Sequence, residues 1–120
     1  MARTDTAQPL ALRTAAQAIY DLKGVDMQVL DLRGLTDAMD YFVIASGTSE
    51  GHVRGLAQKV QTALHASGWG SGNVEGLAAG RWVLIDAVDV VIHLFHPETR
   101  RFYQIERLWG DAPYVTVPVR

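Results

Sequence analysis

Residues Gly80–Trp109, GRWVLIDAVDVVIHLFHPETRRFYQIERLW, decide the fold, because two apolar runs lead directly into an amphipathic stretch. The runs 81–86 and 90–95 are rich in β-branched and aromatic residues, and a short connection ending at Asp89 separates them. This pattern predicts a β-hairpin. Because neither run alternates cleanly between apolar and polar residues, we expect both strands to be buried on two faces.

The amphipathic stretch after the hairpin predicts a helix that begins at Pro97, since proline is tolerated in the first helical turn. Apolar residues recur at helical spacing after it. The expected inner face consists of Phe102, Ile105 and Leu108 or Trp109.

The N-terminal half predicts a helix followed by two strands. The helix runs from about Pro9 to a stop at Gly24, and its apolar positions are Leu12, Ala15, Ala16, Ile19 and Leu22. Strands are expected at 25–32 and at 41–45. The second run is wholly apolar, which favours an interior position in the sheet.

The longest helix is expected after the turn 46–49, with Ser49 as its N-cap. Its buried stripe is Val53, Leu56, Val60 and Leu64, and Ser67-Gly68 ends it. The glycine-rich stretch 69–80 reads as a loop that contains a short edge strand at 73–75.

The order of elements predicts an α/β (α+β) single domain over residues 9–111, with a mixed five-stranded sheet flanked by helices. The last residues, 112–120, alternate between apolar and polar residues but are short and interrupted by prolines. We expect them to form a loose C-terminal tail.

Composition excludes several classes of protein. The chain has 120 residues, 48% of them hydrophobic and 20% charged, which is typical of one soluble domain. It has no cysteine, so disulfides and thiolate metal sites are excluded. Its net charge of −2 includes no basic stripe, which argues against direct binding to nucleic acid. We expect no membrane span, no signal or transit peptide, and a cytoplasmic location.

Three motifs in the same order resemble the ribosomal silencing factor family, also called the Iojap or RsfS family. They are the hairpin 82–95, the helix end Tyr103-x-x-Glu106-x-Leu108-Trp109 and the pair Glu75-Gly76. The segment 40–49 and the pair His52-Val53 add to the resemblance, which covers roughly residues 9–111. It implies a fold similar to nucleotidyltransferase domains. It also implies a translational repressor that binds ribosomal protein uL14 on the large subunit and sterically blocks association with the small subunit.

Resemblance also implies which residues contact the partner. The family's acidic and aromatic positions correspond here to Glu75, Trp82, Asp86, Asp89, Tyr103 and Glu106. From the residues alone, Trp82 is either a partner contact or a core residue, and Asp86 and Asp89 are either solvated turn carboxylates or contacts for a basic partner. The family usually has tyrosine-glycine before the hairpin aspartate, whereas this chain has Ala87-Val88. Because valine resists positive φ, we expect a different type of turn.

A catalytic reading finds little support in the sequence. A nucleotidyltransferase needs two carboxylates two residues apart on one strand, but Asp86 and Asp89 are three apart and flank a turn. The turn 46–49 has one glycine and no following lysine, so helix capping is preferred over phosphate binding. No two histidines have the spacing of a zinc site, and His93 reads as a hydrogen-bonded core residue. We therefore expect a non-enzyme without cofactor or metal; a nucleotide-binding or nucleotidyl-transferring enzyme and a homodimeric adaptor remain alternatives.

Overall fold

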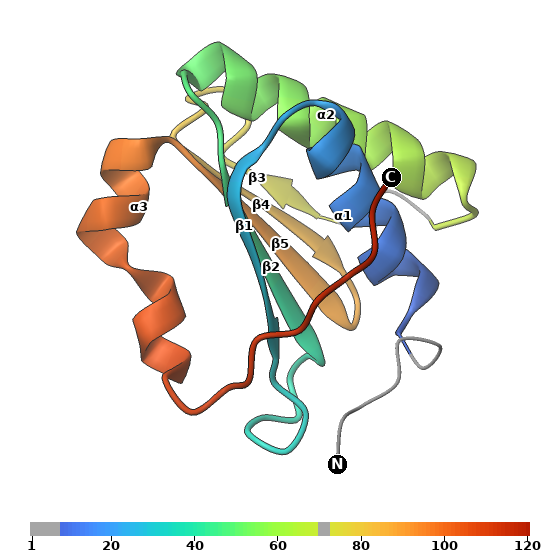
Figure 1. The fold of residues 1–120 in the computed structure, drawn as a ribbon. Coiled ribbons are helices and arrows are strands. Elements are labelled where there is room, and N and C mark those ends of the chain that lie inside the picture. Colours follow the sequence, from blue (N-terminus) through green and yellow to red (C-terminus); the bar gives the residue numbers. More distant parts are fainter. Residues whose placement is uncertain (1–7, 70–72) are drawn as a thin grey trace.

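The computed structural model describes residues 8–69 and 73–120, and it follows the predicted order of helices and strands (Figure 1). The elements are α1 (Leu10–Asp21), β1 (Val25–Asp31), β2 (Tyr41–Ser46), α2 (Glu50–Ala66), β3 (Val74–Glu75), β4 (Trp82–Ala87), β5 (Val90–Phe95), α3 (Pro97–Tyr103) and a 3-10 helix, η2 (Ile105–Trp109).

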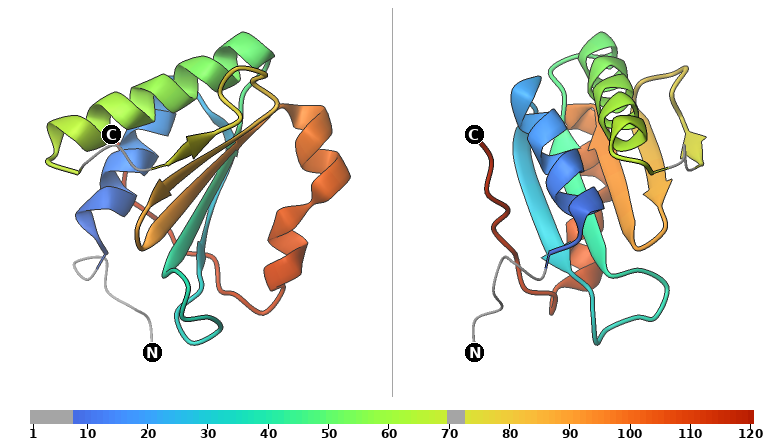
Figure 2. Two further views of the ribbon diagram at one scale, coloured as in Figure 1. Left: turned by 180° about the vertical axis from the view of Figure 1, so that it is seen from behind. Right: turned by 90° about the vertical axis from the view of Figure 1, so that its right-hand side faces the viewer.

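The five strands form one mixed sheet in the order β1-β2-β5-β4-β3. Strands β2 and β5 are parallel, and the other neighbouring pairs are antiparallel. Helices α1 and α2 cover one face of the sheet, and α3 with η2 lies over the other (Figure 2). This arrangement confirms the predicted α+β class and its five-stranded sheet.

The main core lies between the sheet and the helices α1 and α2. Alternate residues of each strand point into it, because successive side chains of a strand face opposite sides. Strand β2 contributes Val43 and β5 contributes Ile92, and both pack against the apolar stripes of the two helices. The predicted stripe of α2 is buried as expected.

A second, smaller core lies on the other face, under η2. It contains Phe42 and Ile44 of β2, Phe95 of β5 and Ile105 of η2. Every residue of β5 is buried, which confirms that this strand is covered on both faces. The same prediction was wrong for β4, whose burial alternates because α3 and η2 leave one of its faces partly open.

The end of α1 differs from the prediction by one residue. Lys23, not Gly24, takes the left-handed conformation, with φ of 61°. Its N–H donates to the Tyr20 carbonyl, and the Gly24 N–H donates to the Ile19 carbonyl. These two bonds form a Schellman motif. Gly24 is needed for a different reason, since a Cβ there would collide with the Ile19 side chain.

The last predicted helix is broken at Gln104. That residue has φ of 46° and accepts the left-handed conformation, so α3 ends at Tyr103 and η2 starts in a new phase. Ile105 is buried as expected. Of the two alternatives Leu108 and Trp109, Trp109 packs against the second core and Leu108 is 76% exposed. Phe102, which the sequence placed on the inner face, is 80% exposed.

The expectation of a loose C-terminal tail was wrong. The segment 112–120 runs along β1 toward α1 (Figure 1). The Asp31 N–H donates to the Pro113 carbonyl at 3.0 Å, and the Val115 N–H donates to the Val29 carbonyl at 2.9 Å. Val117 is buried against the main core. The alternation noticed in the sequence therefore belongs to a segment that covers the edge of the sheet.

Candidate functional site

The structure places most of the residues implied by the resemblance on one side of the sheet. Trp82 and Asp86 alternate along β4 with the buried Val83 and Ile85, so they point toward the side of α3 and η2. Glu75 of β3 pairs with Leu84 and shares that face. Tyr103 ends α3, Glu106 lies in η2, and Asp89 lies in the hairpin turn at the end of the sheet.

Trp82 is the centre of an aromatic cluster that joins the sheet to α3. Its ring centroid lies 4.9 Å from those of both Phe95 and Tyr103. Its indole N–H donates to Nδ1 of His93 at 3.1 Å. Trp82 is only partly buried, so it both packs against the second core and reaches the surface.

His93 is a buried neutral histidine under this cluster, 5% exposed. Because Nδ1 accepts the Trp82 hydrogen bond, the imidazole proton is on Nε2. Burial lowers the pKa of His93 to about 4. Its Nε2 has no hydrogen-bond partner among the described residues. The hydrogen-bonded core histidine expected from the sequence is therefore present.

Other apolar side chains of β4, α3 and η2 are exposed or only partly buried. Tyr103 is 52% exposed, Leu84 is partly buried, and Phe102 and Leu108 are largely exposed. Sequence reasoning missed Leu108 as a surface residue because it assumed one continuous helix, and it missed Phe102 because it assumed that the helix from Pro97 buries one face. Leu84 could have been found, since it shares the parity of Trp82 and Asp86 on β4.

Asp86 holds the hairpin turn. Its Oδ1 accepts a hydrogen bond from the Val88 N–H at 3.0 Å. Val88 has φ of 66°, so the expectation that valine would avoid positive φ was wrong. The Asp86 hydrogen bond offsets part of the strain of a β-branched residue in this region.

Asp89 connects the turn to the rest of the sheet through its main chain. Its carbonyl accepts hydrogen bonds from the N–H groups of Asp40 at 2.7 Å and of Tyr41 at 3.1 Å. The residue itself is exposed, which leaves its carboxylate at the surface.

Glu75 is placed by the glycine that follows it. Gly76 has φ of 83°, and a Cβ there would collide with the Trp82 carbonyl oxygen. The pair Glu75-Gly76 therefore lets β3 turn tightly against the start of β4 while Glu75 remains exposed.

Glu106 has a structural partner within the chain. Its Oε2 accepts a hydrogen bond from Nε of Arg100 at 3.2 Å, and both side chains are mostly buried. Arg100 also donates to Oγ of Ser46 at 3.0 Å. The ion pair ties η2 to α3 and to the end of β2.

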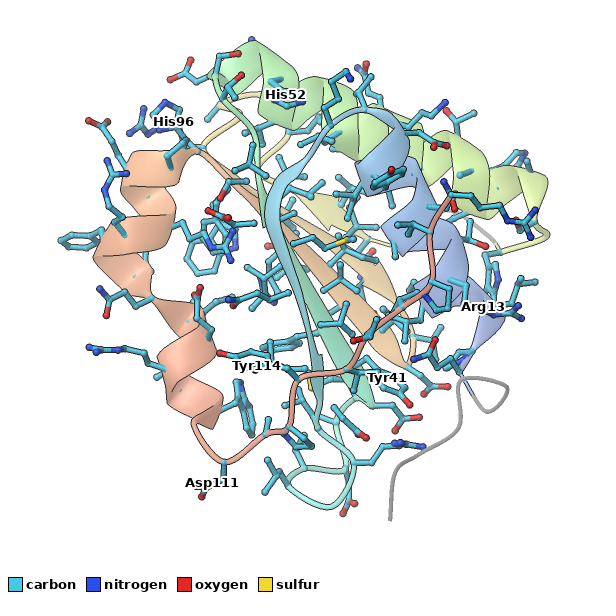
Figure 3. All side chains as sticks on the ribbon, in the orientation of Figure 1. Arg13, Tyr41, His52, His96, Asp111 and Tyr114 are labelled. Carbon is cyan, nitrogen blue, oxygen red and sulfur yellow. The ribbon has the colours of Figure 1, made fainter. Side chains whose placement is uncertain are left out.

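The remaining polar residues singled out in the sequence form hydrogen bonds at the ends of helices. Ser49 accepts a hydrogen bond from the His52 N–H at 3.0 Å and caps α2 as predicted. His52 accepts from the Thr48 N–H at 2.9 Å through Nδ1, so its Nε2 donates to the Leu22 carbonyl at 2.8 Å. It lies in the first turn of α2 (Figure 3). One imidazole therefore links the start of α2 to the end of α1.

The described residues contain no group of three or more histidine, aspartate and glutamate side chains arranged to hold a metal ion. Across residues 8–69 and 73–120, no helix combines the length and the apolar character needed to cross a membrane. What the site offers is a partly apolar surface bordered by carboxylates.

Comparisons with known proteins agree on one family. The family model described as "Ribosomal silencing factor during starvation" (RsfS) matches residues 4–120. Ribosomal silencing factor RsfS of Bacillus subtilis is 39% identical over 106 residues, covering 88% of this chain and 90% of that protein. The Zymomonas mobilis protein of the same name is 40% identical, covering 92% and 83%.

Two crystal structures share the fold. A protein from Chromobacterium violaceum has a TM-score of 0.81 and 40% identity, with 83% of each chain covered. A protein from Bacillus halodurans has a TM-score of 0.79 and 35% identity, with 88% of this chain and 96% of that chain covered. The matched family model, the sequence relatives and the shared fold together place this chain in the RsfS family of ribosomal silencing factors.

Proposed function

We propose that this chain represses translation by binding ribosomal protein uL14 on the large ribosomal subunit, at the face where the small subunit joins. Its family membership supports a ribosomal silencing function. The observation that carries the proposal is the surface formed by β3, β4 and α3, which we call the β4 surface. Its members are Glu75, Trp82, Leu84, Asp86 and Tyr103, with Asp89 at its end.

The β4 surface has the composition of a protein-binding site. Interfaces draw most of their energy from a few aromatic anchors surrounded by a polar rim. Here the Trp82 and Tyr103 rings pack together, and the exposed carboxylates of Glu75 and Asp89 lie at the edge. Carboxylates suit a basic ribosomal protein and would direct its approach more than they would add affinity.

Silencing by this route is steric and needs no reaction. The domain measures 40 × 33 × 26 Å, so anchoring it at the joining face would exclude the small subunit from that space. Asp86, one of the two carboxylates near the hairpin turn, accepts a hydrogen bond from the Val88 N–H and so has a structural role. We therefore propose a regulator rather than an enzyme, located in the cytoplasm with the ribosomes.

Two tyrosines provide a matched test of the surface. Tyr103 and Tyr20 are each 52% exposed, but Tyr20 lies on α1, on the opposite side of the sheet. Tyr103→Ala should weaken binding to purified large subunits by about tenfold, the usual size of an anchor's contribution. Tyr20→Ala should leave binding unchanged.

Sucrose-gradient centrifugation of mixed subunits tests the mechanism. With saturating wild-type protein, joined ribosomes should fall and free subunits should rise, and Tyr103→Ala should restore joining. Undiminished joining at saturation would refute the steric proposal. Equal effects of the two tyrosine variants would refute the assignment of the surface.

A further inference from the structure

His93 is a polar residue in a strand whose other residues are all apolar. It belongs to β5, which is buried throughout, and its ring lies among side chains of the second core. The Phe42 ring is edge-to-face with it at 4.6 Å between centroids, and the Phe95 ring is nearly parallel to it at 6.2 Å. A strand buried on both faces normally has an unbroken apolar run, so His93 interrupts the pattern that packing favours.

One nitrogen of this imidazole has no hydrogen bond. Nδ1 accepts from the Trp82 indole, so the proton is on Nε2, and that buried donor has no partner within residues 8–69 and 73–120. An unpaired buried donor costs free energy on folding. Phenylalanine would fill a similar volume between Phe42 and Phe95 without this cost. Packing alone therefore does not account for a histidine at this position.

What histidine supplies and phenylalanine cannot is an acceptor for the indole of Trp82. Trp82 lies opposite Phe95 in the β4–β5 ladder, and its N–H reaches His93, two positions back along β5. Trp82 is only partly buried, so without this acceptor its N–H could turn toward solvent. The hydrogen bond therefore selects one orientation of the indole on the β4 surface.

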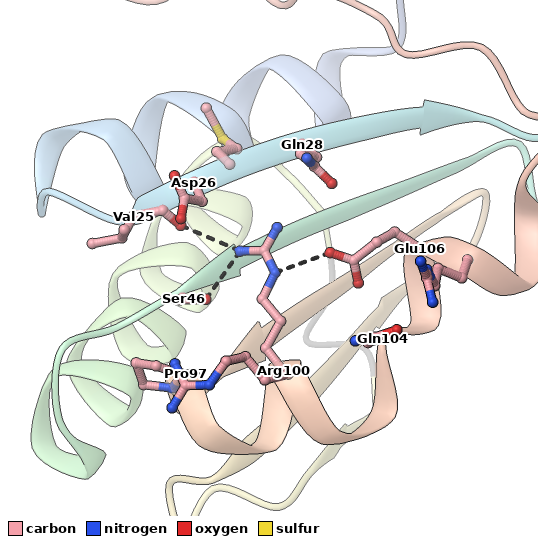
Figure 4. Close-up of a pocket in the computed structure, with 11 residues that line it drawn as sticks. Val25, Asp26, Gln28, Ser46, Pro97, Arg100, Gln104 and Glu106 are labelled. Carbon is pink, nitrogen blue, oxygen red and sulfur yellow. Dashed lines mark hydrogen bonds and ion pairs between the residues drawn. The ribbon is translucent and has the colours of Figure 1, made fainter.

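Tyr103 contacts the same indole from α3, but this helix has little apolar anchoring of its own. None of its residues is buried, and a cavity of about 570 Å³ lies between β1 and the bend that joins α3 to η2. Figure 4 shows Arg100 reaching from α3 to β1, β2 and η2, with which it forms hydrogen bonds and an ion pair. Tyr103 is thus held through polar contacts, whereas His93 attaches the indole directly to the middle strand of the sheet.

We infer that His93 is a positioning residue for the β4 surface, because its hydrogen bond holds the Trp82 indole in the orientation that the partner binds. The inference rests on the proposed function, since it assigns His93 a role in binding the large subunit. His93 is 5% exposed, so it acts only through Trp82. A side chain already held in its bound orientation loses less conformational entropy on binding. The unpaired Nε2–H lowers stability in return, as is common where a residue serves function.

Two substitutions of His93 separate positioning from packing, since they should change stability and affinity in opposite directions. His93→Phe removes the acceptor together with the unpaired N–H. Its melting temperature should equal or exceed that of wild type, whereas its affinity for purified large subunits should fall about three- to tenfold. His93→Asn keeps an acceptor, because asparagine Oδ1, like histidine Nδ1, lies two bonds from Cβ. Its affinity should stay within about twofold of wild type, although the lost ring volume should lower its melting temperature by about 4 °C or more.

Ile92→Val is the matched control for a loss of stability. Ile92 precedes His93 on β5 but points into the main core, on the opposite face of the sheet. This variant should melt at a lower temperature than wild type and bind large subunits with unchanged affinity.

A double variant tests whether His93 acts through Trp82. Trp82→Phe has no indole N–H and so has no use for the acceptor. Adding His93→Phe to Trp82→Phe should cause no further loss of affinity, although it weakens binding when made alone. An additional loss in the double variant would show that His93 acts by another route and would overturn the inference.

Nuclear magnetic resonance of the indole N–H groups tests the hydrogen bond without any ribosome. The chain has three tryptophans, and the signal lost in Trp82→Phe identifies the Nε1–H of Trp82. Exchange of this proton with solvent should be slow in wild type and in His93→Asn. In His93→Phe it should be about tenfold faster or more.

Failure of this inference can be told apart from failure of the proposed function. If wild type binds and Tyr103→Ala weakens binding, but His93→Phe binds as tightly as wild type, the inference is overturned and the proposed function stands. The inference is also overturned if affinity simply follows melting temperature across the variants, or if indole exchange is unchanged in His93→Phe. Wild-type protein that does not bind large subunits would overturn both.

Discussion

The Trp82–His93 hydrogen bond joins the surface cluster to the interior at the scale of single residues. It fixes the indole from below while the Tyr103 ring packs against it from α3. An anchor whose rotamer is already fixed loses less entropy on binding. Of the two alternatives that the sequence left open for Trp82, packing against the core is confirmed, and contact with a partner stays a prediction that its partial exposure permits.

His93 should make the stability of the domain depend on pH. Its pKa is about 4 when folded and 6.5 when unfolded, so the unfolded chain takes up a proton first as pH falls. The stability that comes from a neutral His93 is fully present above pH 6.5 and is lost as the pH falls from there through about 4. Urea unfolding should show on the order of 2–3 kcal/mol lost from this group between about pH 7 and about pH 4.5.

The control for this prediction is His93→Leu, which keeps an apolar side chain in the cluster. The stability of this variant should fall less over the same pH interval, because it lacks the histidine. Any fall that remains comes from other titrating groups, which both proteins share. Parallel pH profiles of the two proteins would contradict the assignment to His93.

Val88 is a strained position whose replacement should stabilise the protein. Val88→Gly removes the Cβ at φ of 66°. Strain of this kind costs about 1–3 kcal/mol, and glycine loses about 1 kcal/mol more entropy on folding, so the expected net gain is about 1 kcal/mol.

Denaturant unfolding measures that gain. Val88→Ala keeps the Cβ and should recover less of the strain. A Val88→Gly protein less stable than wild type would mean that the valine side chain contributes a contact that outweighs its backbone cost.

The roles of single residues could be predicted where they depend only on neighbours in the sequence. Ser49 could be assigned as a cap because capping depends on adjacent residues alone. The role of Gly24 could not be assigned in this way, since it depends on the Ile19 side chain that packs against it. The positive φ of Val88 was also not foreseen. Valine is accepted at positive φ because Asp86 supplies a hydrogen bond two residues earlier.

At the scale of elements, sequence patterns predicted the described strands, the buried stripe of α2 and most of that of α1, although Leu22 at the C-cap of α1 is 37% exposed. Periodicity failed after Tyr103, because one left-handed residue changes the helical phase without a mark in the hydrophobic pattern. Leu108 is exposed as a result, whereas Phe102 lies before Gln104 and is exposed on α3, none of whose residues is buried. The six candidate contacts could not be placed on one surface either, because the position of Glu75 requires the pairing of β3 with β4.

The C-terminal segment should behave as part of the sheet. Truncation after Ala112 would remove the buried Val117 and two hydrogen bonds to β1. Burial of a valine contributes about 1.5–3 kcal/mol, so a loss of at least about 2 kcal/mol is expected.

Hydrogen exchange locates the effect of that truncation. The Asp31 amide donates to Pro113 and should lose its protection when the segment is removed. Deleting only residues 119–120 keeps Val117 and should have a smaller effect. Unchanged protection of Asp31 in the longer truncation would show that the segment does not hold β1.

At the scale of the whole molecule, the two faces of the sheet differ in how fully helices cover them. The α1 and α2 face is fully covered and supplies most of the core. The other face is only partly covered by α3 and η2, which leaves β4 accessible. A scaffold that is rigid on one side can present a surface on the other with little rearrangement on binding.

Association with the large subunit should be sensitive to salt, on the proposal above. Asp89→Lys reverses an exposed charge at the end of the β4 surface and should slow association, whereas Asp21→Lys, on α1, should not. Stopped-flow rates for wild type should fall as ionic strength rises, because salt screens exposed charges. A rate independent of salt would contradict an electrostatic approach.

The position of Val117 has a consequence for how the protein is made. The residues that cover β1 are synthesised long after it, so a nascent chain that lacks them has an uncovered sheet edge. An open edge can pair with another strand. Nascent copies close together on one messenger RNA are therefore exposed to mispairing until residues 113–117 have emerged, and a ribosome that stalls before translating them would lengthen that interval.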